Sequence, residues 1–85
     1  MKKTESGFEF DVDESALDDA ELLEDLVKID RGDTYVIFDA IKKLLGEEGK
    51  ERLYKHLRGT NGRVSLKAVL AEFTEIFNSL KEGKN

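Results

Sequence analysis

The residues able to do acid–base or nucleophilic chemistry are few in this chain, and His56 is its one histidine. Histidine is the side chain best suited to proton transfer near neutral pH. His56 lies in a basic segment between Lys55 and Leu57, and no serine stands in a nucleophile-elbow pattern. No glycine-rich loop ends in the Gly-Lys-Ser or Gly-Lys-Thr that cradles a nucleotide phosphate. The sequence therefore predicts that the protein is not an enzyme, with no catalytic residues and no cofactor.

The many acidic residues raise the question of calcium, and two segments come near an EF-hand loop without matching it. Such a loop needs oxygen ligands at positions 1, 3, 5 and 12 and a glycine at 6. A loop that begins at Asp11 has Ala16 in place of the glycine and Leu22 in place of the final acid. A loop aligned on Asn61 and Gly62 has no carboxylate at positions 1, 3 or 12. A zinc site is also not expected, because the chain has one histidine and no cysteine, so we expect no metal site.

Charge is unevenly placed along the 85 residues. Residues 1–33 carry 4 bases and 12 acids, whereas residues 34–85 carry 10 bases and 7 acids. The nine acids between Glu9 and Asp25 are uninterrupted by any base. Such a chain packs head to tail, binds two differently charged partners, or neutralises itself within one fold. The net charge of −5 and the acidic first third argue against nucleic acid, although a basic helix near residues 47–58 is conceivable in a helix-turn-helix.

Apolar spacing predicts one mainly α domain, a compact bundle of about four helices with a short N-terminal extended arm or strand. Phe8, Phe10 and Val12 alternate with acids, which indicates an extended segment with one apolar face. Helical periodicity then predicts helices over about 18–29, 34–45, 47–58 and 66–80, the first capped by Asp18 and the second ended by Gly46. We expect residues 1–6 and 83–85 to be flexible ends around a single helical domain over 7–82. No apolar run approaches the roughly 18 residues of a membrane span, and the N-terminus lacks the apolar stretch of a secretory signal.

The last helix carries the strongest apolar stripe in the chain. Its apolar residues step by four and three, and they form either core or a partner-binding surface. A domain this small needs such side chains inside, so core is favoured. The stripe consists of Leu66, Leu70, Phe73, Phe77 and Leu80, widened by Val69 and Ile76.

Taken in order, these elements resemble the small tail assembly chaperones encoded by long-tailed phages and prophages. The resemblance spans about residues 6–82 and is a pattern of caps, turns and apolar spacing. It is carried by the segments Ser-Gly-Phe-Glu-Phe-Asp-Val (6–12), Leu-Asp-Asp-Ala-Glu-Leu-Leu-Glu (17–24), Asp-Arg-Gly-Asp (30–33), Lys-Leu-Leu-Gly (43–46) and Asn-Gly-Arg-Val (61–64).

The resemblance implies a non-catalytic function in the cytoplasm of a bacterial host. Such chaperones bind the tape-measure protein during tail assembly, keep its hydrophobic helices soluble and are not expected in the mature virion. Many also exist as a longer form, made by a −1 ribosomal frameshift, whose extension is thought to recruit the tail-tube protein. The ending Gly83-Lys84-Asn85 permits a slippery codon heptamer of the kind used for such a shift.

Two apolar surfaces are candidates for binding a partner or for self-association. A chaperone for a helical client needs an apolar stripe that it can expose and enough charge to stay in solution. The candidate partner-binding residues are Phe8, Phe10 and Val12 on the arm and Phe73, Ile76, Phe77 and Leu80 on the last helix. Whether the arm pairs within its own chain or with a neighbour is open at this point.

The alternative function is an acidic regulatory adaptor that binds a basic protein, or mimics DNA, through Glu9–Asp25. The two functions differ in their response to salt. Binding through charge weakens steeply as the salt concentration rises, whereas binding through apolar side chains persists.

Overall fold

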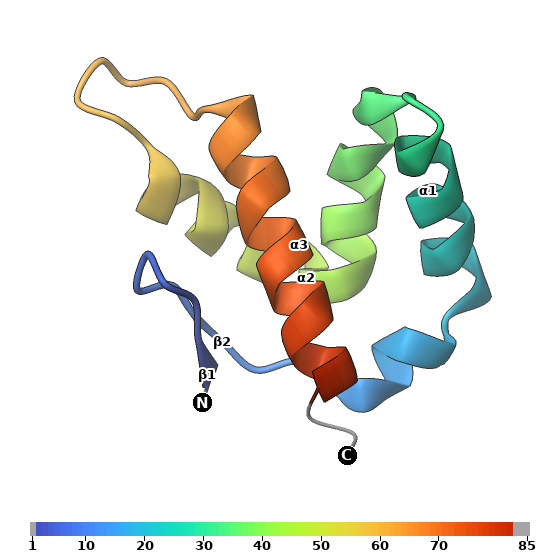
Figure 1. The fold of residues 1–85 in the computed structure, drawn as a ribbon. Coiled ribbons are helices and arrows are strands. Elements are labelled where there is room, and N and C mark those ends of the chain that lie inside the picture. Colours follow the sequence, from blue (N-terminus) through green and yellow to red (C-terminus); the bar gives the residue numbers. More distant parts are fainter. Residues whose placement is uncertain (1, 83–85) are drawn as a thin grey trace.

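Three helices dominate the computed structural model, which describes residues 2–82 (Figure 1). The helices are α1 (Ala20–Asp30), α2 (Ile37–Leu57) and α3 (Leu66–Glu82), with short 3-10 helices η1 (Glu14–Asp18) and η2 (Thr34–Val36). Strands β1 (Lys2–Lys3) and β2 (Glu9–Phe10) form a two-stranded antiparallel sheet. The mainly α fold class is thereby confirmed. No helix of the described part of the chain is long and apolar enough to cross a membrane.

The expected count of four helices is not confirmed, because one kinked helix stands where the second and third were predicted. α2 is continuous over its 21 residues except at Gly46, whose φ of 79° and ψ of 168° are not helical. Such a positive φ is readily adopted by glycine alone, so the chain bends sharply there and resumes the helix in a new direction. The two arms of α2 diverge clearly in Figure 1, where the first is green and the second yellow.

Caps explain where α1 and α3 begin. The carboxylate of Asp19, and not that of Asp18, accepts hydrogen bonds from the amides of Glu21 at 3.0 Å and Leu22 at 3.1 Å. Asp18 instead ends η1, so the cap of α1 lies one residue later than the sequence pattern predicts. The hydroxyl of Ser65 accepts from the amide of Ala68 at 3.1 Å and so caps α3, as predicted.

One hydrophobic core lies between the helices and the N-terminal hairpin. α3 contributes Val69, Phe73, Ile76 and Leu80, spaced by four, three and four residues, so this part of its stripe is core, whereas Leu66 is exposed and Leu70 and Phe77 are half-buried. The buried apolar residues are Phe8, Phe10, Leu22, Ile37, Ala40, Ile41, Leu44, Leu53, Val69, Phe73, Ile76 and Leu80.

The N-terminal arm pairs within its own chain. Lys2 lies opposite Phe10 and Lys3 opposite Glu9, and a turn with Gly7 at a φ of 95° joins the two strands. The structure therefore places residues 2–6, expected to be a flexible extension, in a hairpin. Thr4 is buried there, which apolar patterning cannot reveal because β1 consists of two lysines.

Polar contacts fasten this hairpin to α2 and α3. The hydroxyl of Thr4 donates to the buried carboxylate of Glu72 at 2.8 Å, and Arg52 donates to the carbonyl of Glu9 at 2.6 Å. Lys2 also donates to the carbonyl of Ser79 at 3.3 Å, so β1 lies beside the last turns of α3. β1 and the last turn of α3 accordingly lie at one end of the molecule (Figure 1).

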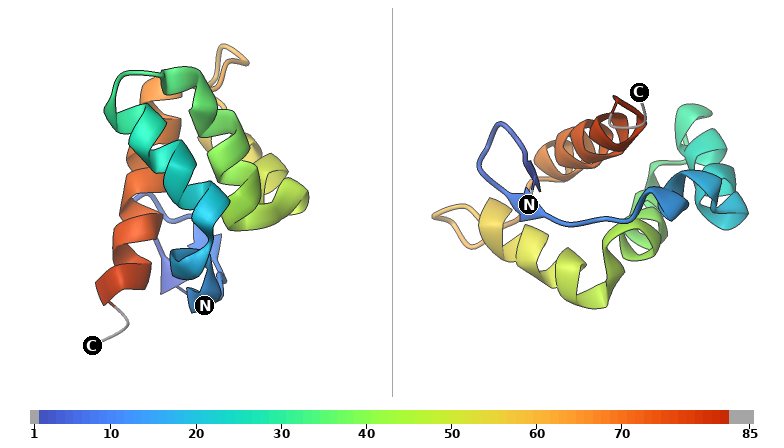
Figure 2. Two further views of the ribbon diagram at one scale, coloured as in Figure 1. Left: turned by 90° about the vertical axis from the view of Figure 1, so that its right-hand side faces the viewer. Right: turned by 90° about the horizontal axis from the view of Figure 1, so that it is seen from below.

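The helices are arranged as two packed pairs around α2. α1 packs against α2 and η2, while α3 packs against α2 and η1. In the right-hand view of Figure 2, α2 forms a V whose first arm lies beside α1, and α3 lies across the open side of the V. The first turns of α2 and of α3 lie at the same end of the molecule, opposite β1 and the last turn of α3 (Figure 1).

Candidate functional site

Most of the residues predicted to bind a partner are core residues in the structure. Five of them are at most 5% exposed, and a partner cannot reach them without opening the fold. Val12 and Phe77 are half-buried against the same core. The five buried side chains are Phe8, Phe10, Phe73, Ile76 and Leu80.

Large apolar side chains are exposed elsewhere. Tyr35 of η2 is 83% exposed, an unusual environment for an aromatic residue, and Phe38 and Leu66 are 39% and 46% exposed. Leu23 and Val27 of α1 are also exposed. Grouped apolar exposure of this kind marks interaction surfaces more often than scattered single residues do.

Two adjoining cavities bring part of this exposed set together. The first has a volume of about 320 Å³ and is lined by Gly32, Thr34, Tyr35, Phe38 and Leu66. The second, of about 170 Å³, is lined by Phe38, Tyr54, Val64, Leu66 and Val69. Because Phe38 and Leu66 line both, the two cavities adjoin. We call Tyr35, Phe38, Tyr54, Val64 and Leu66 the apolar cleft.

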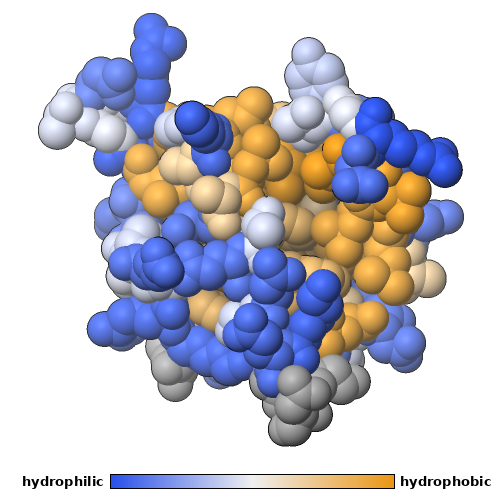
Figure 3. All heavy atoms as spheres, viewed as in Figure 1, coloured by the Kyte–Doolittle hydropathy of each residue, from blue (hydrophilic) through white to orange (hydrophobic). Residues whose placement is uncertain are grey.

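The cleft lies at the end of the molecule where α2 and α3 begin. Figure 3 shows apolar side chains gathered over the upper part of this face, around the start of α3 and across toward α1, with hydrophilic side chains below them. Leu66 belongs to the apolar stripe for which the sequence favours a core position, and Phe38 lies within the predicted helix over 34–45. The structure leaves them at the edge of the core, partly open to solvent.

The kink of α2 builds this cleft. Phe38 lies before Gly46 and Tyr54 after it, and in a straight helix their Cα atoms would be about 24 Å apart. The bend at Gly46 lets both rings line a single cavity. Val64 is held beside them by a β-bridge to Arg58, and Leu66 follows as the first residue of α3.

A cation lies over the aromatic part of the cleft. The ammonium of Lys50 is 5.9 Å from the ring centroid of Phe38 and 5.5 Å from that of Tyr54, within the range of cation–π attraction. Burial also raises the pKa of the Tyr54 hydroxyl above its ordinary value, so the ring is neutral at physiological pH. Within residues 2–82 the ion pairs are Lys42–Glu47 and Lys43–Asp25, and Lys50 belongs to neither.

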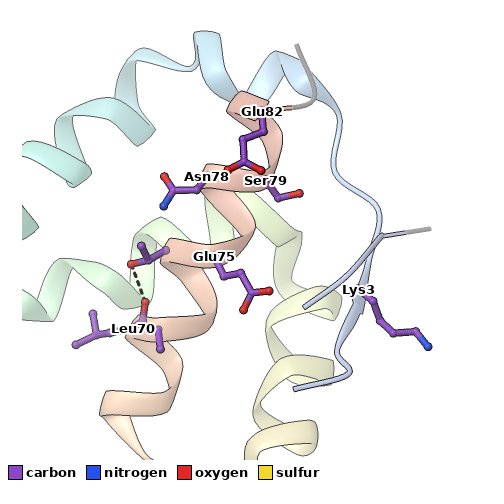
Figure 4. A pocket seen from close by; sticks show the side chains of 8 residues that line it. Lys3, Leu70, Glu75, Asn78, Ser79 and Glu82 are labelled. Atoms are coloured by element: carbon purple, nitrogen blue, oxygen red, sulfur yellow. Dashed lines mark hydrogen bonds between the residues drawn. The ribbon is translucent and has the colours of Figure 1, made fainter. Parts of the chain in front are cut away.

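A larger groove, of about 840 Å³, lies between β1 and α3, and six of its eight lining residues are polar or charged (Figure 4). The carboxylate of Glu75 points toward the hairpin and accepts from the amide of Glu5 at 2.8 Å, while the ammonium of Lys3 points away (Figure 4). The hydroxyl of Thr74 donates to the carbonyl of Leu70 at 2.9 Å within α3. Glu75 and Thr74 are thus hydrogen-bonded to backbone groups, and neither is paired with a nucleophile or a base.

His56 lies 3.0 Å from the Ser6 hydroxyl and packs its ring 5.6 Å from that of Phe8. A serine activated by histidine also needs a third group that orients the imidazole. No such side chain is hydrogen-bonded to the other ring nitrogen within the described residues. The contact fastens the hairpin to α2, and the prediction of a non-enzymatic protein remains a prediction.

Among residues 2–82 no three potential metal-ligating side chains cluster together.

Comparison with protein-family models, with curated proteins and with solved structures found no match. A functional assignment therefore rests on the resemblance in the sequence and on the geometry of the apolar cleft.

Proposed function

We propose that the protein is a phage tail assembly chaperone that binds the tape-measure protein during tail morphogenesis, in the cytoplasm of a bacterial host and without catalysis. The observation that carries the proposal is the apolar cleft, an exposed aromatic and aliphatic surface on a highly charged domain. Long helical clients expose apolar side chains before assembly, and a groove of this kind accepts the apolar face of a helix. The 33 charged side chains keep the complex in solution.

The proposal extends to a second partner. A longer frameshifted form would carry an extension that recruits the tail-tube protein, and the chaperone would be absent from the finished virion. The residues Gly83-Lys84-Asn85, whose codons would permit such a shift, lie outside the described residues.

Expression of the native gene with its downstream DNA intact and an N-terminal tag tests this proposal. We expect an immunoblot and intact-mass measurement to show a minor longer product that shares this N-terminus. Coexpression with the tape-measure protein encoded in the same gene cluster should raise the soluble fraction of that protein. A single product that ends at Asn85, together with an unchanged soluble fraction, would contradict the proposal.

The acidic adaptor remains the alternative, because several acids between residues 9 and 25 are exposed. Three acids of this segment have structural functions, however: Asp13 caps η1, Asp19 caps α1 and Asp25 is paired with Lys43. Binding of a basic protein that weakens steeply with added salt, without any effect of substitutions in the cleft, would favour the adaptor.

A further inference from the structure

We infer that the apolar cleft is the client-binding site and that Lys50 selects clients whose docking helix carries a carboxylate beside its apolar anchors. This inference rests on the proposed chaperone function, since it assigns the site and the chemistry of the client. The occupant is thus an acidic amphipathic helix of another protein.

The form of the cleft favours one segment with two apolar anchors. Its two cavities adjoin and share Phe38 and Leu66 as a common wall, so two side chains of a single segment can enter neighbouring hollows. A helix presents such pairs of side chains at positions i and i+3 or i+4. Tyr35, 83% exposed at the mouth of the larger cavity, is the side chain with the most surface left to bury against such a segment.

Charge on the side of the cleft formed by residues 50–67 favours an acidic client. The ammonium of Lys50 lies over Phe38 and Tyr54 and belongs to neither ion pair found in residues 2–82. Residues 50–67, which supply Tyr54, Val64 and Leu66, contain six bases and a single acid. A carboxylate on the client can pair with Lys50 at the border of a desolvated apolar surface, where such pairs are stronger than in open water.

A second copy of this chain is the competing occupant. Its α1 is acidic and exposes Leu23 and Val27 one turn apart, so it meets the same description. α1 already packs against α2 and η2 of its own chain, however, with Leu22 and Asp25 buried there. The inference therefore commits to a helix of a different protein and makes self-association an outcome of the test.

Two fluorescein-labelled helical peptides of about 20 residues, long enough to be helical in a groove, serve as probes. They share one apolar face with leucines at i and i+4, and the polar face is Glu/Gln in one and Lys/Gln in the other. Fluorescence anisotropy with the full chain at low salt gives the Kd values. We expect the acidic peptide to bind about tenfold more tightly than the basic one.

Four single variants locate the binding. Lys50→Glu should cancel or reverse the preference for the acidic peptide, whereas Lys81→Glu should preserve it. Lys81 is a matched control because its ammonium also lies over a ring, 5.7 Å from that of Phe77 and outside the cleft. Tyr35→Asp should weaken the acidic peptide about tenfold. Leu23→Asp, an equal charge change at an exposed apolar residue that lines neither cavity, should weaken it by no more than about twofold.

Several results would overturn the inference. The first is that the two peptides bind with equal Kd values, or that neither binds. The second is that Lys50→Glu and Lys81→Glu change the Kd values equally, and the third is that Tyr35→Asp and Leu23→Asp do so. A concentration-dependent dimer in sedimentation that Tyr35→Asp abolishes would assign the cleft to a second copy instead. Circular dichroism of each variant confirms that it is folded before its Kd is compared.

The same variants in the tape-measure solubility assay separate this inference from the proposed function. If the wild-type protein and the cleft variants solubilise the tape-measure protein equally, the function stands and the cleft assignment fails. If the wild-type protein does not solubilise it, the proposed function fails, and the peptide Kd values alone decide whether the cleft binds an acidic helix.

Discussion

Among single side chains, the ion pair between Asp25 and Lys43 ties α1 to the first arm of α2. The ammonium lies 2.6 Å from the carboxylate, and the Asp25 side chain is only 8% exposed. The hydrogen bond to Asp25 is the main cause that raises the pKa of Lys43 above its ordinary value, against a smaller opposing effect of burial. A buried carboxylate that loses its partner destabilises the fold more than an exposed one does.

We expect the contribution of this pair to folding stability to be lost at alkaline pH. Because the pKa of Lys43 is higher in the folded chain than in the unfolded one, the contribution is complete below the ordinary lysine pKa of about 10.4 and declines as the pH rises through the raised value. Lys43→Met should lower the urea midpoint near neutral pH and remove this part of the alkaline decline. Lys42→Met is the control, because its 3.5 Å pair with Glu47 is solvent-exposed. Equal midpoints for the two variants would contradict the prediction.

A second buried contact, between Thr4 and Glu72, joins the hairpin to α3. Both residues are nearly inaccessible, and the threonine hydroxyl donates to the carboxylate at 2.8 Å. Thr4→Val keeps the shape and removes the donor, so the buried carboxylate loses its partner at a cost of about 1–3 kcal/mol in the free energy of unfolding. Urea unfolding measures the loss, and Thr4→Val combined with Glu72→Leu should recover part of it. A change below about 0.5 kcal/mol would show that the contact contributes little.

Of the helices, α2 depends most on a single residue. Gly46 has a φ of 79° and a ψ of 168°, and a Cβ added there would meet nothing within 4 Å. Substitution is therefore opposed by backbone strain alone. We expect Gly46→Ala to destabilise the fold by about 1–3 kcal/mol in urea unfolding.

Chirality provides the control for that prediction. A D-alanine at position 46, introduced by chemical synthesis, favours positive φ and should retain most of the stability that L-alanine loses. Equal stability of the two synthetic proteins would refute the strain argument.

The elements were predictable to the extent that they follow apolar periodicity and caps. The last helix was predicted over 66–80 and spans Leu66–Glu82, since Ser65 marks its start and its stripe faces the core. β1 has no apolar residue, and its pairing depends on a turn and on the distant Glu72, so no local pattern indicates it. Gly46 was predicted to end a helix. The sequence does not distinguish a glycine that ends a helix from one that kinks it, because only the direction of the following segment differs.

The candidate site was harder to predict than the elements. Its residues come from η2, both arms of α2, the loop before α3 and the first turn of α3. Helical periodicity favoured Leu66 as core, whereas the structure leaves both Leu66 and Phe38 partly exposed, and the bend at Gly46 brings Phe38 and Tyr54 to one cavity. Sequence patterns therefore predicted the part of the core that α3 supplies and missed the surface that we propose as functional.

For the molecule as a whole, the packing of the two helix pairs predicts unequal stability. α1 buries only Leu22 and Asp25, whereas α3 buries five residues along its length. We expect the amides of α1 to exchange hydrogen earlier than those of α3, because a helix with fewer buried contacts opens at lower cost. Hydrogen–deuterium exchange with peptides of both helices from one digest tests this directly. Equal protection of the two helices would show that the domain opens only as a unit.

The hydrogen bond from Lys2 to the carbonyl of Ser79 places the start of the N-terminal hairpin beside the last turns of α3. α3 begins at the cleft with Leu66 and ends at Glu82, about 24 Å away along its axis. Lys2 and Glu82, at the two ends of the described residues, thus lie at the pole opposite the cleft. Surface immobilisation through a side chain at either position leaves the cleft facing solution, and two dyes placed there would report whether the domain is folded without covering the cleft.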